Sequence, residues 1–263
     1  MSIKDFFSRK DVRETIAKAG VGENDLMKLE KAAEDADQTG PIIALVGETG
    51  VGKSSTINAL FGADRPTSFI RPCTTDPEKV RKIFDGGKGN VTLLDMPGLG
   101  HSISQDKIHY ENYRKSIPEC DVVLWIFQSN AKTMTNAQVN LQRMVHEGVL
   151  KPERLVVGIN KVDVIPATDP WVADFNLPSE SQLKSISEYE EMVGERLREI
   201  GIDIGCNVVS YSAVRRYNLH GLFSSMFHAV PEDRRWIIKN RKDLASPLEL
   251  LDPEIAKEMR MMS

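Results

Sequence analysis

The sequence predicts a doubly wound α/β fold, in which helices cover both faces of a mostly parallel sheet. Apolar, β-branched runs recur at intervals that leave room for a helix between them. Four of these runs are apolar almost throughout, as strands buried on both faces usually are. The glycine-rich stretch GETGVGKSS follows the first run directly, and ligands of such folds bind where the strands end.

The expected sheet is mixed, with one antiparallel edge strand. Apolar runs predict six strands, at 42–47, 79–84, 91–95, 122–127, 155–160 and 206–210. The second run, KVRKIF, alternates polar and apolar residues, and DGGKGN separates it from the third run. This pattern indicates an antiparallel hairpin at the edge of the sheet.

Helices are expected between these strands and at both ends of the chain. The internal helices are predicted at about 53–61, 104–116, 134–147, 180–200 and 219–229. A stretch with three prolines, 164–181, is predicted to be an inserted loop. We therefore expect a helical extension over 1–39, a main α/β domain over 40–230 and a helical tail over 231–263.

Composition excludes several classes of protein. The 263 residues are 41% hydrophobic and 27% charged, with a net charge of -4, which is ordinary for a globular protein and unlike one that coats nucleic acid. Nothing indicates DNA binding. The three cysteines, Cys73, Cys120 and Cys206, are far apart and predict neither a disulfide framework nor a zinc site. No stretch approaches ~18 apolar residues, and no apolar leader is apparent, so we expect a cytoplasmic protein.

The GETGVGKSS stretch meets the phosphate-binding pattern G-x-x-x-x-G-K-[ST] through Gly47, Gly52, Lys53 and Ser54. Successive backbone N–H groups would point at a phosphate, Lys53 would add charge, and the Ser54 hydroxyl would bind Mg²⁺. The helix that follows would direct its positive end at the same anion. The expected phosphate contacts are Gly47, Glu48, Thr49, Gly50, Val51, Gly52, Lys53, Ser54 and Ser55.

Three further motifs follow strand ends, and two of them indicate guanine. In DMPGLG, Asp95 would reach Mg²⁺ through water and the Gly98 N–H would contact the γ-phosphate. In NKVD, Asp163 would accept hydrogen bonds from N1–H and the 2-amino group of guanine, donors that adenine does not offer there. The expected ligands are therefore GTP and GDP with Mg²⁺.

The other residues of these motifs would support the guanine base. Asn160 would brace the NKVD loop, and the aliphatic stem of Lys161 would cover one face of the base. In SYSA, the Ala213 N–H would donate to guanine O6 while Ser212 steadies the turn.

A switch loop is predicted between the first helix of the α/β domain and the edge hairpin. The stretch PTSFIRPCTTDPEKV is too polar and too rich in proline for a core element. One of its threonines would close over Mg²⁺ and the γ-phosphate. We favour Thr75, with Thr74 as the alternative.

Together, GETGVGKSS, the TT pair, DMPG, NKVD and SA resemble the Era-like group of the TRAFAC GTPases over about residues 40–230. The overall resemblance is greatest to bacterial YfjP-type GTPases, and the phosphate loop is also similar to those of immunity-related and septin-type GTPases. The resemblance implies a P-loop NTPase G domain that hydrolyses GTP and acts as a switch. Lys53, Thr75 and Gly98 would then have the catalytic roles.

Two departures from related GTPases predict slow hydrolysis by the isolated chain. Leu99 follows DMPG where Ras-like proteins have a water-orienting glutamine. Gly50 stands where some Era-like proteins have an asparagine that holds potassium. Arg71, His101 and Gln105 are candidates for completing the site, and a partner or a second copy across the nucleotide face is the alternative.

The sequence leaves the effector open among three classes. The basic stretch RRWIIKNRK, 234–242, suggests an RNA or ribosomal partner. A self-assembling or membrane-associated GTPase of dynamin or septin type is suggested by Gly50 and by an apolar stripe of Ile255, Met259 and Met262. The third class is a nucleotide-binding scaffold with negligible catalysis, since Leu99 leaves the attacking water without a partner.

Overall fold

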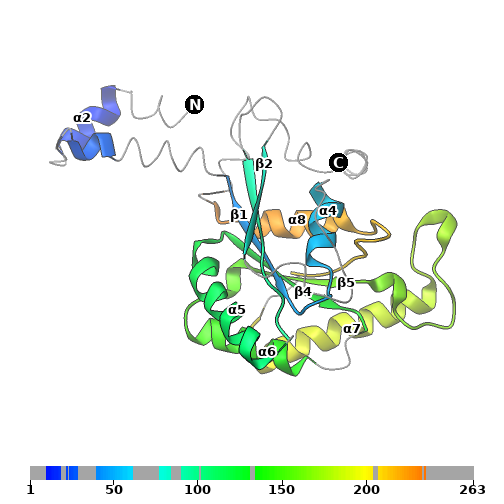
Figure 1. Ribbon diagram of the computed structural model, residues 1–263. Coiled ribbons are helices and arrows are strands. Elements are labelled where there is room, and N and C mark those ends of the chain that lie inside the picture. The colour runs from blue at the N-terminus through cyan, green and yellow to red at the C-terminus, as the bar shows by residue number, and fades with distance from the viewer. Residues whose placement is uncertain are drawn as a thin grey trace.

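The computed structural model has the doubly wound α/β architecture that the sequence predicts (Figure 1). It describes residues 10–18, 22, 24–28, 40–61, 77–83, 90–100, 102–130, 134–203, 207–232 and 234. Several predictions concern residues outside these ranges, namely Arg71, Cys73, Thr74, Thr75, His101, Cys206, Ile255, Met259, Met262 and most of the terminal stretches 1–39 and 231–263.

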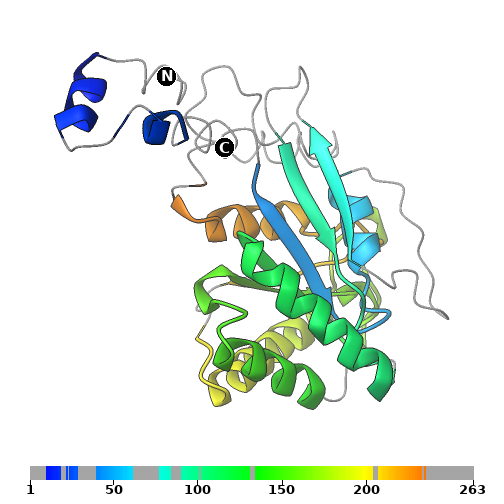
Figure 2. The same cartoon turned by 60° about the vertical axis from the view of Figure 1, so that its left-hand side comes forward.

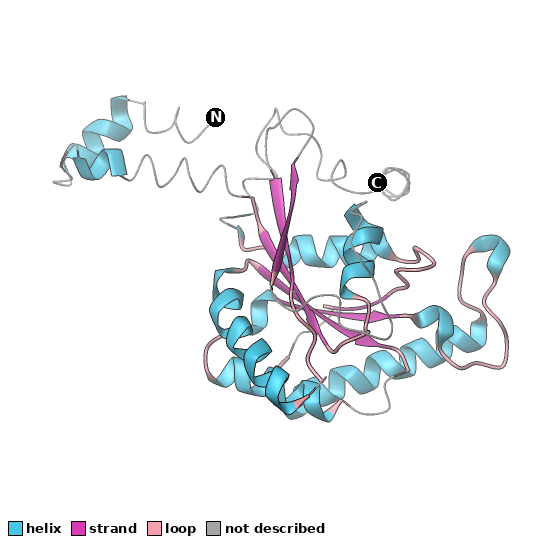
Figure 3. Ribbon diagram, in the orientation of Figure 1, coloured by secondary structure: helices cyan, strands magenta, loops and turns pink. Residues whose placement is uncertain are grey.

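A six-stranded mixed sheet forms the centre of the fold (Figure 3). Its spatial order is β2-β3-β1-β4-β5-β6, and only the β2–β3 pair is antiparallel. The strands are β1 (Ile42–Gly47), β2 (Glu78–Ile83), β3 (Asn90–Asp95), β4 (Val122–Gln128), β5 (Leu155–Asn160) and β6 (Val208–Ser210). The predicted antiparallel edge strand is therefore confirmed.

Helices cover both faces of this sheet. In the described residues the covering helices are α4 (Lys53–Phe61), α5 (Ile103–Ser116), α6 (Thr135–His146), α7 (Glu180–Glu199) and α8 (Leu219–Ala229), whereas α2 (Lys10–Lys18) lies away from the sheet in Figure 1. Figure 2 shows α5 crossing in front of the strands, with α4 and α8 on the opposite side. No helix within the described ranges is long and apolar enough to cross a bilayer.

Alternate residues of the buried strands supply two separate cores. In β1, Ile43 and Leu45 belong to the core under α4 and α8, whereas Ala44 and Val46 belong to the core under α5, α6 and α7. Because successive side chains of a strand point to opposite faces, a continuous apolar run is needed to fill both cores. This requirement explains why the central strands show no alternation in the sequence.

The predicted element boundaries agree with the structure to within one or two residues in most cases. The predicted loop 164–181 contains a short 3₁₀ helix, Ala173–Phe175, and a bridge that pairs Val172 with Leu177. Helix α7 begins directly after this loop with a capping box: the Ser179 hydroxyl accepts from the Gln182 N–H, and the Gln182 side chain accepts from the Ser179 N–H. The inserted loop thus has defined local structure.

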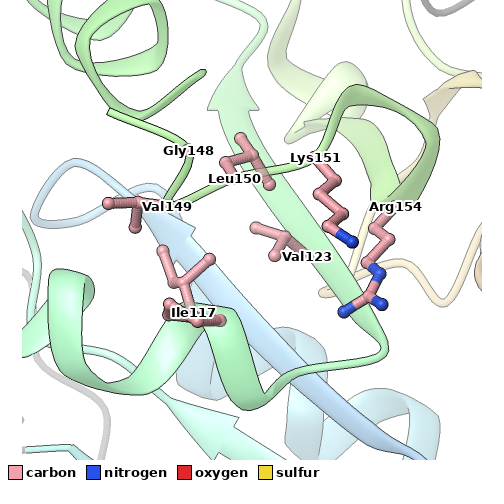
Figure 4. Close-up of a pocket in the computed structure, with 8 residues that line it drawn as sticks. Ile117, Val123, Gly148, Val149, Leu150, Lys151 and Arg154 are labelled. Atoms are coloured by element: carbon pink, nitrogen blue, oxygen red, sulfur yellow. The ribbon is translucent and has the colours of Figure 1, made fainter. Parts of the chain in front are cut away.

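A small pocket lies near the beginning of β4 (Figure 4). Its volume is about 50 Å³, which is room for ordered water. Ile117, Val123, Val149 and Leu150 line it together with the stems of basic residues. It is too small for a nucleotide, and it lies at the amino end of β4, away from the predicted phosphate loop at the carboxyl end of β1.

A partly buried ion pair fastens the segment after α8 to the sheet. Asp121, just before β4, accepts hydrogen bonds from the Arg234 guanidinium at 3.1 and 3.3 Å and from the Ile42 N–H at 2.8 Å. Arg234 also donates to the carbonyl of Gly40 at 3.3 Å. The segment after α8 is therefore tied to the beginnings of β1 and β4.

We predict that Asp121→Ala lowers the free energy of unfolding by ~2–4 kcal/mol, because it leaves a largely buried guanidinium and the Ile42 N–H without their acceptor. Urea denaturation followed by circular dichroism measures this change. Glu195→Ala, at an exposed position on α7, is the control and should change stability by less than ~0.5 kcal/mol. Equal stability of the two variants would contradict the prediction.

Candidate functional site

The predicted phosphate loop connects the end of β1 to the beginning of α4. Gly52 has φ +99°, and a Cβ added there would collide with the side-chain nitrogen of Asn160, so only glycine fits. Helix α4 begins at Lys53, and its first turn forms as the Thr56 N–H donates to the Gly52 carbonyl at 2.8 Å. The loop therefore leads into a helix N-terminus, where an anion is favoured.

Lys53 is buried at the centre of this loop, with 8% of its surface exposed. Its Nζ donates to the carbonyls of Gly47 at 3.1 Å and Glu48 at 3.0 Å. Burial lowers the pKa of Lys53 to about 8, and the nearby carboxylates of Asp95 and Glu48 oppose this shift. A buried cation satisfied only by carbonyls and more distant carboxylates is well suited to receive an anionic ligand.

Two of the predicted Mg²⁺ ligands lie in direct contact. The Ser54 hydroxyl donates to Oδ2 of Asp95 at 2.8 Å. Ser54 belongs to the first turn of α4, whereas Asp95 is the fully buried last residue of β3. A hydroxyl and a carboxylate at one point form the oxygen donor set that Mg²⁺ uses beside nucleotide phosphates. Thr75, the third predicted ligand, lies outside the described residues.

The DMPGLG loop lies against the phosphate loop and is hydrogen-bonded to it. The Thr49 N–H donates to the Leu99 carbonyl at 2.9 Å, and the Leu99 N–H donates to the Gly47 carbonyl at 3.3 Å. A Cβ added at Gly98 would approach Thr49 to 2.6 Å, so this close packing requires glycine. The Leu99 side chain is only 3% exposed and belongs to the core. Leu99 thus packs in the interior, where it cannot orient a water.

Two buried side chains of α5 hold the DMPGLG loop from the other side. The Tyr113 hydroxyl donates to the Pro97 carbonyl at 2.7 Å, and Nδ1 of His109 lies 2.8 Å from the Gly98 carbonyl. Since a carbonyl only accepts, Nδ1 of His109 carries the proton in this contact. Sequence reasoning did not identify either residue, because an aromatic pair four positions apart on a helix is an ordinary core pattern.

Gln105 is the one candidate for assisting the reaction that lies within the described residues. It occupies the first turn of α5 with its side chain exposed, and its backbone N–H donates to the Ser102 hydroxyl at 3.3 Å. Its position is therefore fixed by the helix cap, and its catalytic role stays a prediction.

Asn160 joins three loops of the site. Its Nδ2 donates to the Val51 carbonyl of the phosphate loop at 2.9 Å. Its Oδ1 accepts from the backbone N–H of Lys161 at 2.8 Å and from that of Ala213 at 3.0 Å. The predicted bracing role of Asn160 thus has a specific geometry, in which one buried amide connects the phosphate loop with NKVD and SYSA.

Lys161 is also directed toward the phosphate loop. It has a left-handed backbone, φ 66°, and its Nζ donates to the Gly50 carbonyl at 2.6 Å and to Oε1 of Gln128 at 3.2 Å. Burial lowers the pKa of Lys161, and the Asp163 carboxylate opposes that shift. Its proposed contact with the base stays a prediction.

The remaining base-side residues follow β5 and β6. Asp163 lies in the short 3₁₀ helix Val162–Val164, and its carbonyl accepts from Nε2 of Gln182 at 3.4 Å. The buried Ser212 hydroxyl accepts from the Arg215 N–H at 3.0 Å, which closes the SYSA turn. The Ala213 N–H, predicted to reach guanine O6, here donates to Asn160. To bond guanine O6, the Ala213 N–H would have to be shared between both oxygens or give up its bond to Asn160.

Tyr211 connects the SYSA turn to α4, which sequence reasoning did not anticipate. Its hydroxyl lies 2.8 Å from the hydroxyl of Thr56, and both residues are fully buried. No spacing rule singles out this tyrosine, since its partner lies 155 residues away.

Comparison with known proteins points to one class of domain. Residues 42–161 match the family model described as 50S ribosome-binding GTPase. Two Escherichia coli proteins, YkfA and YfjP, are 40% identical over 96 residues (36% of this chain) and 32% identical over 108 residues (41% of this chain). Those matches cover 33% and 37% of the two relatives, so the chain spans about a third of their length. GTPase Era of Halothermothrix orenii is 26% identical over 191 residues, which are 72% of this chain and 55% of that protein.

Solved structures agree on the fold. Era in complex with MgGDPNP and a fragment of 16S ribosomal RNA has a TM-score of 0.52, with 22% identity over 74% of this chain and 58% of that one. The bacterial dynamin GTPase LeoA from ETEC has a TM-score of 0.57, with 17% identity over 85% of this chain and 42% of that one. At these identities the likeness concerns the fold alone.

We predict that Asn160→Asp lowers the free energy of unfolding by ~2–4 kcal/mol without nucleotide, because a buried carboxylate oxygen would then face the Val51 carbonyl. Asn160→Ala should cost ~1–3 kcal/mol, since two N–H donors lose their acceptor. Urea denaturation at neutral pH measures both. Asn136→Asp, exposed in the first turn of α6, is the control, and an Asn160→Asp protein as stable as this control would refute the prediction.

Proposed function

From the premise that the chain is an Era-like member of the TRAFAC GTPases, related to YfjP, we propose that it binds GTP with Mg²⁺ and hydrolyses it to GDP. Binding and hydrolysis would make it a nucleotide-dependent switch, in which the loops around the γ-phosphate differ between the two nucleotide states. The proposed G domain is 40–230, with helical extensions over 1–39 and 231–263.

One observation carries this proposal, namely the convergence of Lys53, Ser54 and Asp95 at the carboxyl ends of β1 and β3. The Ser54 hydroxyl lies 2.8 Å from Asp95, and the buried ammonium of Lys53 is held by carbonyls of the same loop. A structural role alone does not account for a buried lysine whose pKa is lowered to about 8. A phosphate and a cation together would satisfy both charges.

Mg²⁺ fits the donors that are present. It would be held by the Ser54 hydroxyl, with Asp95 reached through water and Thr75 as a proposed switch ligand. The bound cation would neutralise charge that develops on the phosphate oxygens during transfer. The chain's own residues would orient the phosphates: backbone N–H groups of the loop 47–54, Lys53 and the Gly98 N–H.

Guanine is the proposed base because Asp163 can pair with two donors that only guanine presents in this geometry. Support comes from the position of Asp163 directly after β5 and from the bond that its carbonyl accepts from Gln182, which fixes the loop. Hydrogen bonds to a charged acceptor contribute ~1.5–3 kcal/mol each. Two such bonds are sufficient for strong discrimination against adenine.

We predict that Asp163→Asn weakens GDP binding about a hundredfold or more and shifts preference toward xanthine nucleotides, whose C2 carbonyl suits an amide donor. Competition titration against a fluorescent guanine nucleotide, with GDP, XDP and ADP as competitors, measures the preference. Asp169→Asn, an exposed position in the following loop, is the matched control. If parent and Asp163→Asn proteins rank the three nucleotides identically, guanine recognition by Asp163 is wrong.

Slow turnover by the isolated chain is part of the proposal. Leu99 is buried and Gly50 offers no side chain, so neither a water-orienting glutamine nor a potassium ligand is available at these positions. A second copy or a partner that supplies an arginine would raise the rate ~10³ to 10⁵-fold.

We predict a single-chain rate at or below ~10⁻³ s⁻¹, the scale of a GTPase that lacks an arginine finger. Phosphate release per molecule, measured over a wide dilution series in sodium and in potassium, tests this rate. A rate that increases with protein concentration indicates stimulation by a second copy, and a flat slow rate indicates dependence on another partner. Lys53→Ala, which should lose nucleotide affinity, gives the background, and fast hydrolysis independent of concentration would contradict the prediction.

We propose that an RNA or ribosomal partner recognises the nucleotide state of the switch. Its support is the description of the matching family model as 50S ribosome-binding GTPase. The basic stretch 234–242 is the proposed contact within this chain.

A further inference from the structure

Beside the base-side loops, two exposed segments carry large apolar side chains that no described part of the chain covers. Phe175 is 75% exposed and Leu177 is 51% exposed in the inserted loop, while Val214 in the SYSA turn is 76% exposed. Val172, the backbone partner of Leu177, is 39% exposed. We call these four residues the insertion patch. Apolar residues that gather on a surface, rather than being scattered singly, mark interaction sites.

The insertion patch is held in a defined conformation by contacts beneath it. The Trp171 ring, which is buried, packs edge-on against Tyr217 at 5.2 Å between centroids, and its Nε1 donates to Oδ1 of Asn176 at 3.3 Å. Nδ2 of Asn176 donates to the Arg215 carbonyl at 2.8 Å, which joins the inserted loop to the SYSA turn. In Figure 1 this loop is the yellow-green projection beside α7. An already ordered loop loses little conformational entropy when a partner binds.

The two segments of the patch carry opposite charges. Asp169 and Asp174 are exposed in the inserted loop, and residues 162–183 contain no lysine or arginine. The SYSA turn carries Arg215, which is exposed, and Arg216. Within the described part of the chain, neither the Asp174 carboxylate nor the Arg215 guanidinium forms an ion pair. Both charges are therefore available to a partner.

We infer that the insertion patch docks a second copy of this chain about a two-fold axis. In such an interface the same surface meets itself, so the acidic inserted loop of one copy faces the arginine turn of the other, twice. Phe175 is the proposed anchor, since it is the largest of the four side chains and is 75% exposed, and a few large side chains supply most of the binding energy of an interface. RNA or an anionic bilayer fits less well, because its phosphates would meet Asp169 and Asp174.

This self-association does not depend on the proposed chemistry, although the two surfaces adjoin. The inserted loop begins directly after the 3₁₀ helix that contains Asp163, and Gln182 of α7 bonds the Asp163 carbonyl. Nucleotide binding is measured separately for every variant, so loss of dimerisation and loss of nucleotide binding are distinguished.

Sedimentation equilibrium of the full chain tests the inference. Over ~1 to ~100 µM, which brackets a micromolar dissociation constant, the mass should increase from that of one 29.4 kDa chain toward that of two. The double variant Phe175→Ser and Leu177→Ser should raise the dissociation constant at least ~tenfold, about 1.4 kcal/mol. Val139→Ser, an equally apolar exposed position on α6, is the control and should leave it unchanged.

A charge exchange tests the two-fold pairing. Asp174→Arg and Arg215→Asp should each weaken self-association, because like charges would then face each other twice. An equimolar mixture of the two variants should recover a dimer, since both pairs are then of opposite charge. A parent mass that stays at one chain over the whole range, a dimer insensitive to Phe175 and Leu177, or a mixture that recovers nothing would each overturn the inference.

Discussion

The amide of Asn160 is the interaction on which the geometry of the site depends. The phosphate loop, the NKVD loop and the SYSA turn follow three different strands, β1, β5 and β6. Because Nδ2 of Asn160 donates to Val51 while Oδ1 accepts from Lys161 and Ala213, a single buried group fixes all three. The requirement for glycine at position 52 follows from this contact, since Asn160 fills the space that a Cβ would occupy. A buried amide with every polar atom satisfied favours one arrangement of its neighbours over all others.

Charge compensation is the second constraint on the site. Lys53 and Asp95 are both buried, yet the nearest partners of Lys53 are the carbonyls of Gly47 and Glu48, and Asp95 accepts from the Ser54 hydroxyl. The DMPGLG loop closes over this region through the backbone of Leu99, supported from behind by Tyr113 and His109. A ligand that brings a γ-phosphate would have to compete with these bonds between Leu99 and the phosphate loop. The packing of α5 therefore helps to hold the DMPGLG loop against the phosphate loop.

The inserted loop between β5 and α7 is held in one conformation by its own side-chain hydrogen bonds. It is tied at one end by the Ser179 capping box and in its middle by Asn176, which bonds both Trp171 and the SYSA turn. These contacts use the loop's polar groups internally and leave Phe175 and Leu177 in solvent. Since solvent exposure of such side chains is unfavourable, their position is consistent with a role in contact with another molecule.

The sequence by itself determined the class of fold, the order of strands and helices and the motifs at strand ends. These follow from local periodicity and from short patterns such as GETGVGKSS, in which residues close in the chain act together. Contacts between distant residues could be decided only by the tertiary structure. The bond from Asn160 to Val51 spans 109 residues and the Thr56–Tyr211 pair spans 155, and neither leaves a local pattern. The role of Leu99 also depended on the tertiary structure. In the sequence it stands where a glutamine is missing, and in the structure it is a core residue. Only the packing of α5 against the sheet shows which side of the DMPGLG loop is buried.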